Sequence, residues 1–261
     1  MPRLGLISAM QQELALVLAR MQESGGGARC ERVAGRDFWC GAWQGREVVA
    51  VLSGIGKVAA ATTAALLAER FAVAQVVFTG AAGGLAAGVA VGDVVVADEL
   101  LQHDMDASPL FPKYEMPLYG RARFAADPAL AQALAQAARH ALARPHVTLG
   151  ADAVAEFALH RPRVHHGLIA SGDRFIATRA ESDALRQALP DALAVEMEGA
   201  AAAQVCHDLG LPFAALRIIS DRADDSAHAD FLRFIDRVAS RYSLAVIQAW
   251  LAGERAQPLG V

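Results

Sequence analysis

The sequence predicts an α/β fold, a single domain with a central twisted sheet flanked by helices. Short apolar runs alternate with amphipathic segments of about 10–15 residues, which is typical of βαβ units and of a mostly parallel sheet. The chain has 261 residues, 54% of them hydrophobic, so one domain of this class can hold the whole chain around a large core. No low-complexity linker or internal repeat divides the sequence.

The N-terminal half alternates strands with helices. The apolar run at residues 4–10 predicts a buried strand, and the spacing of Leu14, Val17 and Met21 predicts a helix behind it. Gln44-Gly45-Arg46 separates two apolar runs as a hairpin turn would. We therefore expect strands at residues 4–10, 37–43, 47–53, 75–79 and 93–97, and helices at residues 13–21 and 56–71.

The C-terminal half continues this alternation after an irregular segment. The prolines within residues 105–120 exclude a regular helix there. Pro128 suits the first turn of a helix, whereas Gly210 and Pro212 suit a helix end. We expect strands at residues 164–171, 192–197 and 213–220, and helices at residues 128–142, 198–209 and 230–251, with no assignment for residues 143–163.

Charge and cysteine content narrow the possible partners and the location. Lys and Arg number 24 and Asp and Glu 28, so the formal charge of −4 predicts neither a nucleic-acid partner nor binding to an anionic membrane. The uncharged stretch at residues 71–92 is long enough to cross a bilayer, but its glycines favour a buried strand and a loop. Three cysteines and an N-terminal apolar run too short for a signal peptide predict a cytoplasmic protein.

The segment Gly54-Ile55-Gly56-Lys57-Val58-Ala59 lies between a predicted strand and a predicted helix and fits a loose dinucleotide-binding fingerprint. That fingerprint also needs an acidic residue at the end of the next strand, where this chain has Thr79-Gly80. A P-loop is excluded because Val58 follows Lys57. We favour a tight turn whose backbone closely approaches a ligand, with dinucleotide binding as the alternative.

Signatures of a metal site or a serine hydrolase are missing from the sequence. The histidines show no H-x-x-x-H spacing, and no Cys/His cluster occurs. No G-x-S-x-G segment is present either. We therefore expect no bound metal.

Carboxylates follow the ends of three predicted strands, namely Glu13, the segment Glu196-Met197-Glu198 and Asp221. Each of them alone could cap a helix, because acidic side chains favour the first helical turn. The carboxyl ends of strands in such sheets are also where ligands bind. Two carboxyl groups around a sugar cleave glycosidic bonds, one by protonating the leaving group and the other by activating water.

Six sequence blocks, in order and correctly spaced over about residues 3–250, carry a specific resemblance. Together they are similar to the 5′-methylthioadenosine/S-adenosylhomocysteine nucleosidases of the purine nucleoside phosphorylase superfamily, which implies a mixed central sheet. The blocks are Ala9-Met10-Gln11-Gln12-Glu13, Ser53-Gly54-Ile55-Gly56-Lys57-Val58, Thr79-Gly80-Ala81-Ala82-Gly83-Gly84-Leu85, Ser171-Gly172-Asp173-Arg174-Phe175-Ile176, Val195-Glu196-Met197-Glu198-Gly199-Ala200 and Arg217-Ile218-Ile219-Ser220-Asp221.

The resemblance implies hydrolysis of the N-glycosidic bond of adenine thioribosides, with release of adenine, in methionine salvage. By similarity, Glu13 is the base that activates water and Asp221 is the acid that protonates adenine N7. The apolar run before Asp221 leads us to expect a buried, protonated carboxyl, because burial raises a carboxyl pKa. Glu198 resembles the residue that binds the ribose hydroxyls, and we expect it to be ionised because it opens a helix.

Further substrate contacts follow from the same similarity. They comprise a ring that stacks on adenine, contacts to the base and the sugar, an arginine near the acidic cluster, and an apolar wall for the 5′-alkylthio group. The family implies no cofactor and no metal, an adenine nucleoside and water as reactants, and a homodimer. The residues are, in that order, Phe175; Ile176, Gly83 and Met197; Arg217; and Met10, Ile55 and Phe231.

Two features depart from the family pattern. Ala81 stands where many relatives have serine, which removes one hydroxyl contact. Residues 105–120, which in the family cross a dimer interface and complete the partner's 5′ pocket, match only loosely. Either Leu110 or Phe111 could serve that purpose here. The preference among 5′ substituents therefore stays open.

Three alternatives compete with the nucleosidase. A phosphorylase of the same fold needs an anion site, usually built from arginines and a hydroxyl, whereas Ala81 offers no hydroxyl and Glu13 would repel phosphate. The others are a nucleosidase for another purine nucleoside, such as AMP or a futalosine-like substrate, and an inactive nucleoside-binding module. The presence of both Glu13 and Asp221 favours an enzyme, because binding alone needs neither a base nor an acid.

Overall fold

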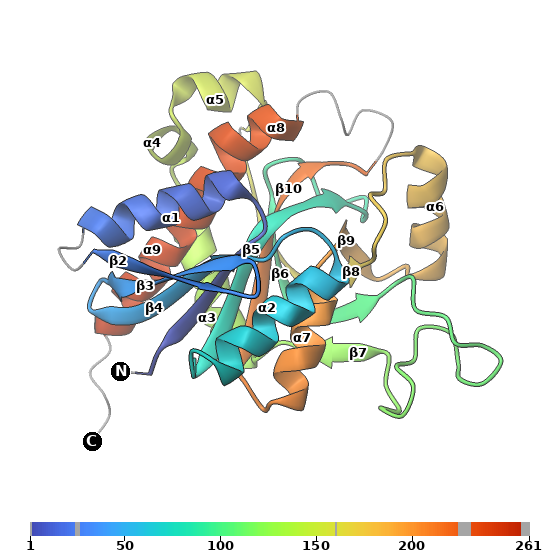
Figure 1. Ribbon diagram of the computed structural model, residues 1–261. Coiled ribbons are helices and arrows are strands. Elements are labelled where there is room, and N and C mark those ends of the chain that lie inside the picture. Colours follow the sequence, from blue (N-terminus) through green and yellow to red (C-terminus); the bar gives the residue numbers. More distant parts are fainter. Residues whose placement is uncertain (1, 24–26, 160, 224–230, 257–261) are drawn as a thin grey trace.

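A ten-stranded mixed sheet organises the fold (Figure 1). The computed structural model describes residues 2–23, 27–159, 161–223 and 231–256. The strands are β1 (Leu4–Ser8), β2 (Ala28–Val33), β3 (Arg36–Trp43), β4 (Arg46–Leu52), β5 (Gln75–Gly84), β6 (Val94–Gln102), β7 (Arg123–Ala125), β8 (Val164–Ser171), β9 (Ala192–Glu196) and β10 (Phe213–Asp221).

Five of these strands close into a ring. β5 pairs with β10 and β9, β8 lies between β9 and β6, and β6 pairs with β10. From β5 the sheet continues through β1, β4, β3 and β2. The ring combines parallel and antiparallel pairs, because β6 runs against β10 and β9 crosses the end of β5 in the opposite direction. The sheet is therefore mixed, as the family resemblance implies, and not mostly parallel as the alternation of elements predicts.

Helices cover both faces of this sheet (Figure 1). On one face α1, α3 and α9 bury their apolar sides in a common core with the strands, and on the other α2 and α7 do the same. The helices are α1 (Gln11–Glu23), α2 (Lys57–Glu69), α3 (Pro128–Leu142), α4 (Pro145–Leu149), α5 (Ala151–Glu156), α6 (Arg179–Ala188), α7 (Gly199–Asp208), α8 (Phe231–Phe234) and α9 (Ser240–Ala256), with a π-helical segment (Ile235–Ala239) between the last two.

Elements with strong local signals match their predicted bounds. The helix predicted at residues 128–142 is confirmed: Pro128 occupies its first turn, and the Asp127 carboxylate accepts a hydrogen bond from Leu130 N at 2.9 Å. The strand predicted at residues 164–171 is also confirmed. β2, β7, α4, α5 and α6 were not predicted. For α6 a signal exists, because Thr178 and Glu181 form a capping box at its start.

β5 is longer than predicted and runs through the glycines as far as Gly84. A Cβ atom at Gly83 would lie 2.8 Å from Ala223 Cβ and 3.0 Å from Asp221 Oδ1. A Cβ atom at Gly80 would lie 3.0 Å from Ala9 Cβ. These glycines therefore allow β5 to continue between closely packed neighbours instead of ending in a loop.

The end of the chain differs from the single helix predicted at residues 230–251. Residue 230 lies outside the described residues, and the helix from Phe231 onward changes from α to π at Ile235 and back to α at Ser240. The uncharged stretch at residues 71–92 contains the strand β5 and no helix. Among the described residues, no helix is long and apolar enough to cross a membrane. No helix forms at residues 105–120, as predicted.

Candidate active site

A pocket lies where the carboxyl ends of β1, β5, β8, β9 and β10 meet. Most of the residues predicted for the site line it, and only Glu13 and Arg217 are absent from its wall. The lining residues are Ala9, Met10, Ile55, Ala81, Ala82, Gly83, Arg174, Phe175, Ile176, Val195, Glu196, Met197, Glu198, Ser220, Asp221 and Phe231.

Two aromatic rings contribute to the apolar part of the pocket. Phe175 and Phe231 meet edge to face, with ring centroids 6.0 Å apart and an interplanar angle of 83°. Phe175 remains 42% exposed, although it is large and apolar. Met10 and Ile55 line the same pocket. An exposed aromatic face beside a pocket is suited to stack on a flat ligand.

Glu13 lies buried in α1 and is only 1% exposed. Its Oε2 accepts a hydrogen bond from Met10 N at 3.2 Å, and its Oε1 accepts one from Ser243 Oγ at 2.7 Å. Burial raises the pKa of the Glu13 carboxyl, and these hydrogen bonds and the charge of Arg217 oppose that rise. Glu13 therefore sits directly behind the pocket wall that Met10 contributes, as a carboxyl held by donors on two elements.

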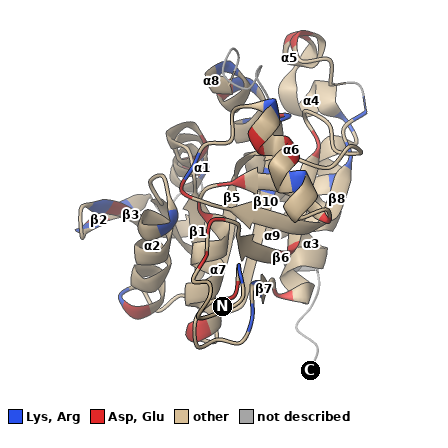
Figure 2. Ribbon diagram, turned by 90° about the vertical axis from the view of Figure 1, so that its right-hand side faces the viewer, with Lys and Arg blue, Asp and Glu red and all other residues tan. Residues whose placement is uncertain are grey.

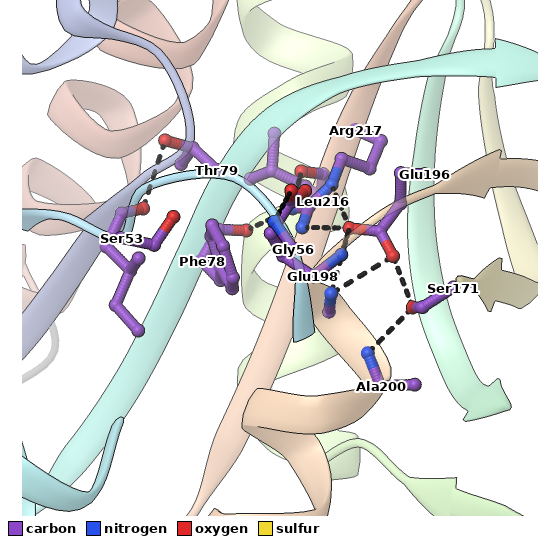
Figure 3. Close-up of polar contacts among 12 residues, drawn as sticks. Ser53, Gly56, Phe78, Thr79, Ser171, Glu196, Glu198, Ala200, Leu216 and Arg217 are labelled. Atoms are coloured by element: carbon purple, nitrogen blue, oxygen red, sulfur yellow. Dashed lines mark hydrogen bonds and ion pairs between the residues drawn. The ribbon is translucent and has the colours of Figure 1, made fainter. Parts of the chain in front are cut away.

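Glu196 is held on all sides by donors (Figure 3). Arg217, which is fully buried, bonds Glu196 Oε2 through Nη2 at 2.7 Å, and the Ser171 hydroxyl donates to Oε1. The backbone amides of Glu198 and Gly199, at the start of α7, donate to the same carboxylate at 2.9–3.1 Å. The positive end of α7 is therefore occupied by Glu196.

Glu198 does not have the environment that the sequence predicts. Its side chain lines the pocket and accepts a hydrogen bond from Gly56 N at 2.8 Å, rather than capping α7. Burial, followed by the repulsion from Glu196, raises the pKa of Glu198 to about 7. The expectation that the start of α7 favours the ionised form of Glu198 is therefore wrong in its cause, because Glu196 accepts the hydrogen bonds of the first amides of α7.

Asp221 is less buried than predicted. β10 is fully enclosed up to Ile219, but Ser220 and Asp221 emerge from the core and are only half-buried. Asp221 Oδ2 accepts a hydrogen bond from Ser220 Oγ at 2.6 Å, and Oδ1 accepts one from Ala223 N at 2.7 Å. The apolar residues of β10 that led us to expect a buried carboxyl end at Ile219, two residues before Asp221, and do not surround its side chain.

The glycine segment before α2 approaches two carboxylates. Gly54 and Gly56 have positive φ angles of 78° and 93°, which glycine adopts without strain. Gly56 N donates to Glu198, and Lys57 N donates to Asp173 Oδ1 at 2.8 Å. The backbone of this turn thus approaches two side chains of the same chain, Glu198 and Asp173. This contact favours the interpretation as a tight turn and not the one as a dinucleotide-binding segment.

Several site residues escaped the sequence reasoning. Ser171 and Ser243 each bond a buried glutamate of the site, and Arg174 lines the pocket. Ser171 is the last residue of a strand that the sequence predicts, and this position at a strand end could have marked it as a site residue. Ser243 lies 230 residues from Glu13 in the chain, and no local pattern marks it.

Comparison with known proteins identifies the family of the chain. A family model described as the phosphorylase superfamily matches residues 3–250. The chain belongs to the phosphorylase superfamily. A 5′-methylthioadenosine/S-adenosylhomocysteine nucleosidase of Anoxybacillus flavithermus is 37% identical over 237 residues, which cover 90% of this chain and 92% of the relative.

Solved structures of the superfamily extend this likeness to the fold. A Streptococcus pneumoniae nucleosidase of the same name, in complex with the transition-state inhibitor MT-ImmA, is 35% identical with a TM-score of 0.79, and the match covers 95% of this chain and 98% of that chain. The Neisseria meningitidis enzyme with methylthio-immucillin-A is 33% identical with a TM-score of 0.82, covering 97% and 100%. The predicted family and fold class are thereby confirmed, whereas the roles of individual residues stay predictions.

Proposed function

We propose that this chain hydrolyses the N-glycosidic bond of 5′-methylthioadenosine and S-adenosylhomocysteine, and also of 5′-deoxyadenosine, releasing adenine. The observation that carries the proposal is the likeness, over nine tenths or more of the chain, to nucleosidases that act on the first two compounds by name. The pocket supports it, because an apolar aromatic wall faces carboxyl groups at the strand ends. Such a pocket suits a purine, a sugar and a thioether together.

Glu13 acts as the general base. Water attacks C1′ of the ribose, its proton passes to the Glu13 carboxylate, and the C1′–N9 bond breaks with its electron pair going to adenine. Glu13 lies beside the pocket and is fixed by Met10 N and Ser243, as a base has to be to meet a bound water. Until it takes up that proton, the carboxylate also favours the positive charge that develops on the ribose.

Asp221 delivers the proton that adenine needs. Adenine leaves poorly as an anion, and protonation at N7 makes it neutral as the bond breaks. Asp221 lines the pocket, and its hydrogen bonds from Ser220 and Ala223 fix the carboxyl at the end of β10. The acid therefore stands on a rigid strand end and does not depend on a loop.

The other pocket residues bind the substrate. Glu198 accepts hydrogen bonds from the ribose hydroxyls, with Met197 under the sugar and Gly83 close to both sugar and base. Phe175 stacks on adenine and the backbone of Ile176 reads its edge. Met10, Ile55 and Phe231 enclose the 5′ group. Arg217 does not reach the substrate in this scheme, because it is fully buried and holds Glu196.

Phosphorolysis fits the pocket less well than hydrolysis. Ala81 lines the pocket without a hydroxyl, and buried Glu13 would repel a phosphate next to it. Arg217, whose charge could attract phosphate, is paired with Glu196. Water is therefore the nucleophile that the described residues favour.

Product analysis tests the proposal. The purified protein is incubated with each of 5′-methylthioadenosine, S-adenosylhomocysteine, 5′-deoxyadenosine and a futalosine-like nucleoside, with and without phosphate. We expect free adenine and the free ribose product from the first three, at a rate independent of phosphate. A ribose 1-phosphate product would identify a phosphorylase. A preference for the futalosine-like nucleoside would identify another purine nucleosidase.

The chain forms a homodimer in this proposal, acts in the cytoplasm and serves methionine salvage. Large apolar side chains are exposed at the start of α2, where Val58 is 78% exposed, and in residues 105–120, where Leu110 is 83% exposed. The Lys57–Asp104 ion pair of 2.7 Å brings these two segments together. Exposed apolar patches of this kind support association. Sedimentation equilibrium should give twice the mass of one chain, and Leu110→Asp should lower it.

A further inference from the structure

A serine of the C-terminal helix reaches the proposed base from the far end of the chain. Ser243 Oγ donates to Glu13 Oε1 at 2.7 Å across a sequence separation of 230 residues. Both residues are almost fully buried, at 3% and 1% exposure. Since Met10 N donates to the second oxygen, each carboxylate oxygen has its own donor, and the plane of the carboxyl is fixed.

The π-helical segment before α9 sets the direction of this serine. A π turn holds one residue more than an α turn, so the helix after Ile235–Ala239 is rotated by about 100° relative to an uninterrupted α-helix. Phe231 lies before the segment and lines the pocket, whereas Ser243 lies after it and bonds Glu13. One helical unit thus supplies both a pocket wall and a partner of the proposed base, and the π turn reconciles the two directions.

We propose that Ser243 is a positioning residue that orients the Glu13 carboxylate toward the attacking water and stabilises its charge. The inference rests on the proposed function of Glu13 as the base. Ser243 touches neither the water nor the nucleoside in this scheme and acts through Glu13 alone. A base held within a narrow range of orientations makes proton transfer more probable in each encounter with the bound substrate.

The Ser243 hydrogen bond also affects the pKa of Glu13, and the direction of this effect can be measured. Burial raises the pKa of Glu13, and the Ser243 hydrogen bond is the largest effect that lowers it, ahead of the amides of Met10 and Ala9 and the charge of Arg217 on β10. Removing the hydroxyl therefore raises the pKa of Glu13 further. Because the base works only when ionised, the acid limb of the pH profile moves to higher pH.

The first experiment compares Ser243→Ala with Ser240→Ala. Ser240 is a matched control, since it is 1% exposed, begins α9 and donates only within the helix, to Asp236 O at 2.8 Å. We expect Ser243→Ala to lower kcat by roughly 5- to 50-fold on the high-pH plateau, with KM within about twofold, because the base is less well oriented. We also expect the acid limb to shift upward by roughly half to one pH unit, so that the loss is larger on that limb than on the plateau. Ser240→Ala should keep the wild-type profile.

Two further variants separate positioning from a loss of stability. Ser243→Cys keeps a side chain of similar size with a weaker donor, so it should lie between wild type and Ser243→Ala in both kcat and pH profile. If Ser243→Ala does not fold, Ser243→Cys is compared with the wild type instead. In a Glu13→Gln background, Ser243→Ala should cost less than about twofold in kcat, because the group through which it acts is already lost.

The outcomes distinguish this inference from the proposed function. Glu13→Gln with wild-type kcat overturns Glu13 as the base and this proposal with it. A Glu13→Gln variant that has lost about 10²–10⁴-fold in kcat, beside a Ser243→Ala variant with wild-type kcat and pH profile, overturns the role of Ser243 alone. An undiminished loss in the Glu13→Gln background, or a loss without any shift of the acid limb, also overturns it, because Ser243 then does not act through the Glu13 carboxylate.

Discussion

Glu196 and Glu198 stand two residues apart at the end of β9, both buried, and they have opposite environments. Glu196 receives hydrogen bonds from a serine, two backbone amides and a buried arginine. Glu198 turns into the pocket, accepts a hydrogen bond from Gly56 N, and has its pKa raised by burial and by Glu196. Burial alone therefore does not distinguish the two carboxylates, whereas the number of protein donors around each of them does.

The two sides of the site differ in the same way. Behind the wall lies Arg217, which pairs with the wall residue Glu196; this pair connects β9, β10 and the start of α7 and contributes to structure. In front of it, Glu198, Asp221 and Phe175 line the pocket and keep groups turned toward a ligand. Charged residues farther out are of both signs, as on α6 in Figure 2, where acidic and basic residues both occur. Substitutions behind the wall should lower stability, and those in front should lower activity.

The largest expected effect lies behind the wall. Arg217→Met leaves Glu196 buried without its cation, which should lower the free energy of unfolding by about 3–5 kcal/mol. Urea unfolding measures this. The double variant Arg217→Met/Glu196→Gln removes both charges and should recover part of the loss. If the single variant is as stable as the wild type, the pair is not structural and the comparison fails.

Asp221→Asn should affect catalysis without affecting the fold. The amide keeps the shape but has no transferable proton, so kcat on adenine nucleosides should fall ~10²-fold or more while the unfolding midpoint stays unchanged. A nitrophenyl riboside, whose leaving group needs no protonation, serves as the control substrate and should lose much less. Equal losses on both substrates would assign Asp221 a structural or electrostatic role.

Glu198→Gln should raise stability at alkaline pH. The folded-state pKa of about 7 lies above the ordinary value of 4.5, so proton binding stabilises the fold at low pH and this stabilisation is lost as the pH rises through 7. The neutral amide avoids the buried charge and should unfold at higher urea at pH 8, by a margin on the order of 1–3 kcal/mol that vanishes near pH 4. The exposed Glu69→Gln is the control.

The same variant should bind substrate less well. An ionised carboxylate accepts both ribose hydroxyl protons, whereas an amide offers one acceptor. In the wild type, KM should rise as the pH falls below about 7, because Glu198 then becomes protonated. A wild-type KM that is constant between pH 5 and 8 would separate Glu198 from ribose binding.

The smallest expected effect concerns the aromatic wall. Phe175→Ala should weaken substrate binding by about 1–3 kcal/mol, the usual contribution of an aromatic ring stacked on a base, whereas Phe175→Tyr should keep most of it. Because Phe175 is 42% exposed, its loss should leave the urea midpoint unchanged. Unaltered binding in the alanine variant would show that the ring does not contact the purine.

Local signals account for what could be predicted from the sequence. Asp127 and Pro128 mark the start of α3 through contacts within one turn, so the predicted bounds are correct. The pocket gathers most of the predicted residues because they follow strand ends, which meet at one place in any sheet of this kind. The family resemblance named those residues, and the topology explains why they lie together.

What could not be predicted depends on side-chain direction or on distant partners. Glu196 and Glu198 look equivalent in a Glu-Met-Glu segment, and they are told apart only by distant partners such as Ser171 and Arg217, which bond Glu196. Ser243 finds Glu13 because a π turn rotates α9, and a hydrophobic periodicity of 3.6 does not reveal that turn. The apolar run before Asp221 predicts a buried carboxyl, but hydrophobicity along a strand does not reveal that its last two residues leave the core.

The closed ring of strands determines which parts of the sheet can unfold locally. β5 is hydrogen-bonded to β1, β9 and β10, and Val76, Val77 and Phe78 are fully buried, so the amides of this part of β5 cannot meet solvent unless several ladders separate together. Amide hydrogen exchange there should follow global unfolding, while the edge strand β2, bonded to β3 alone among the described strands, should exchange through local fraying. The strands beneath the pocket are thus the last part of the protein to open, so filling and emptying the pocket need not involve any parting of the strands.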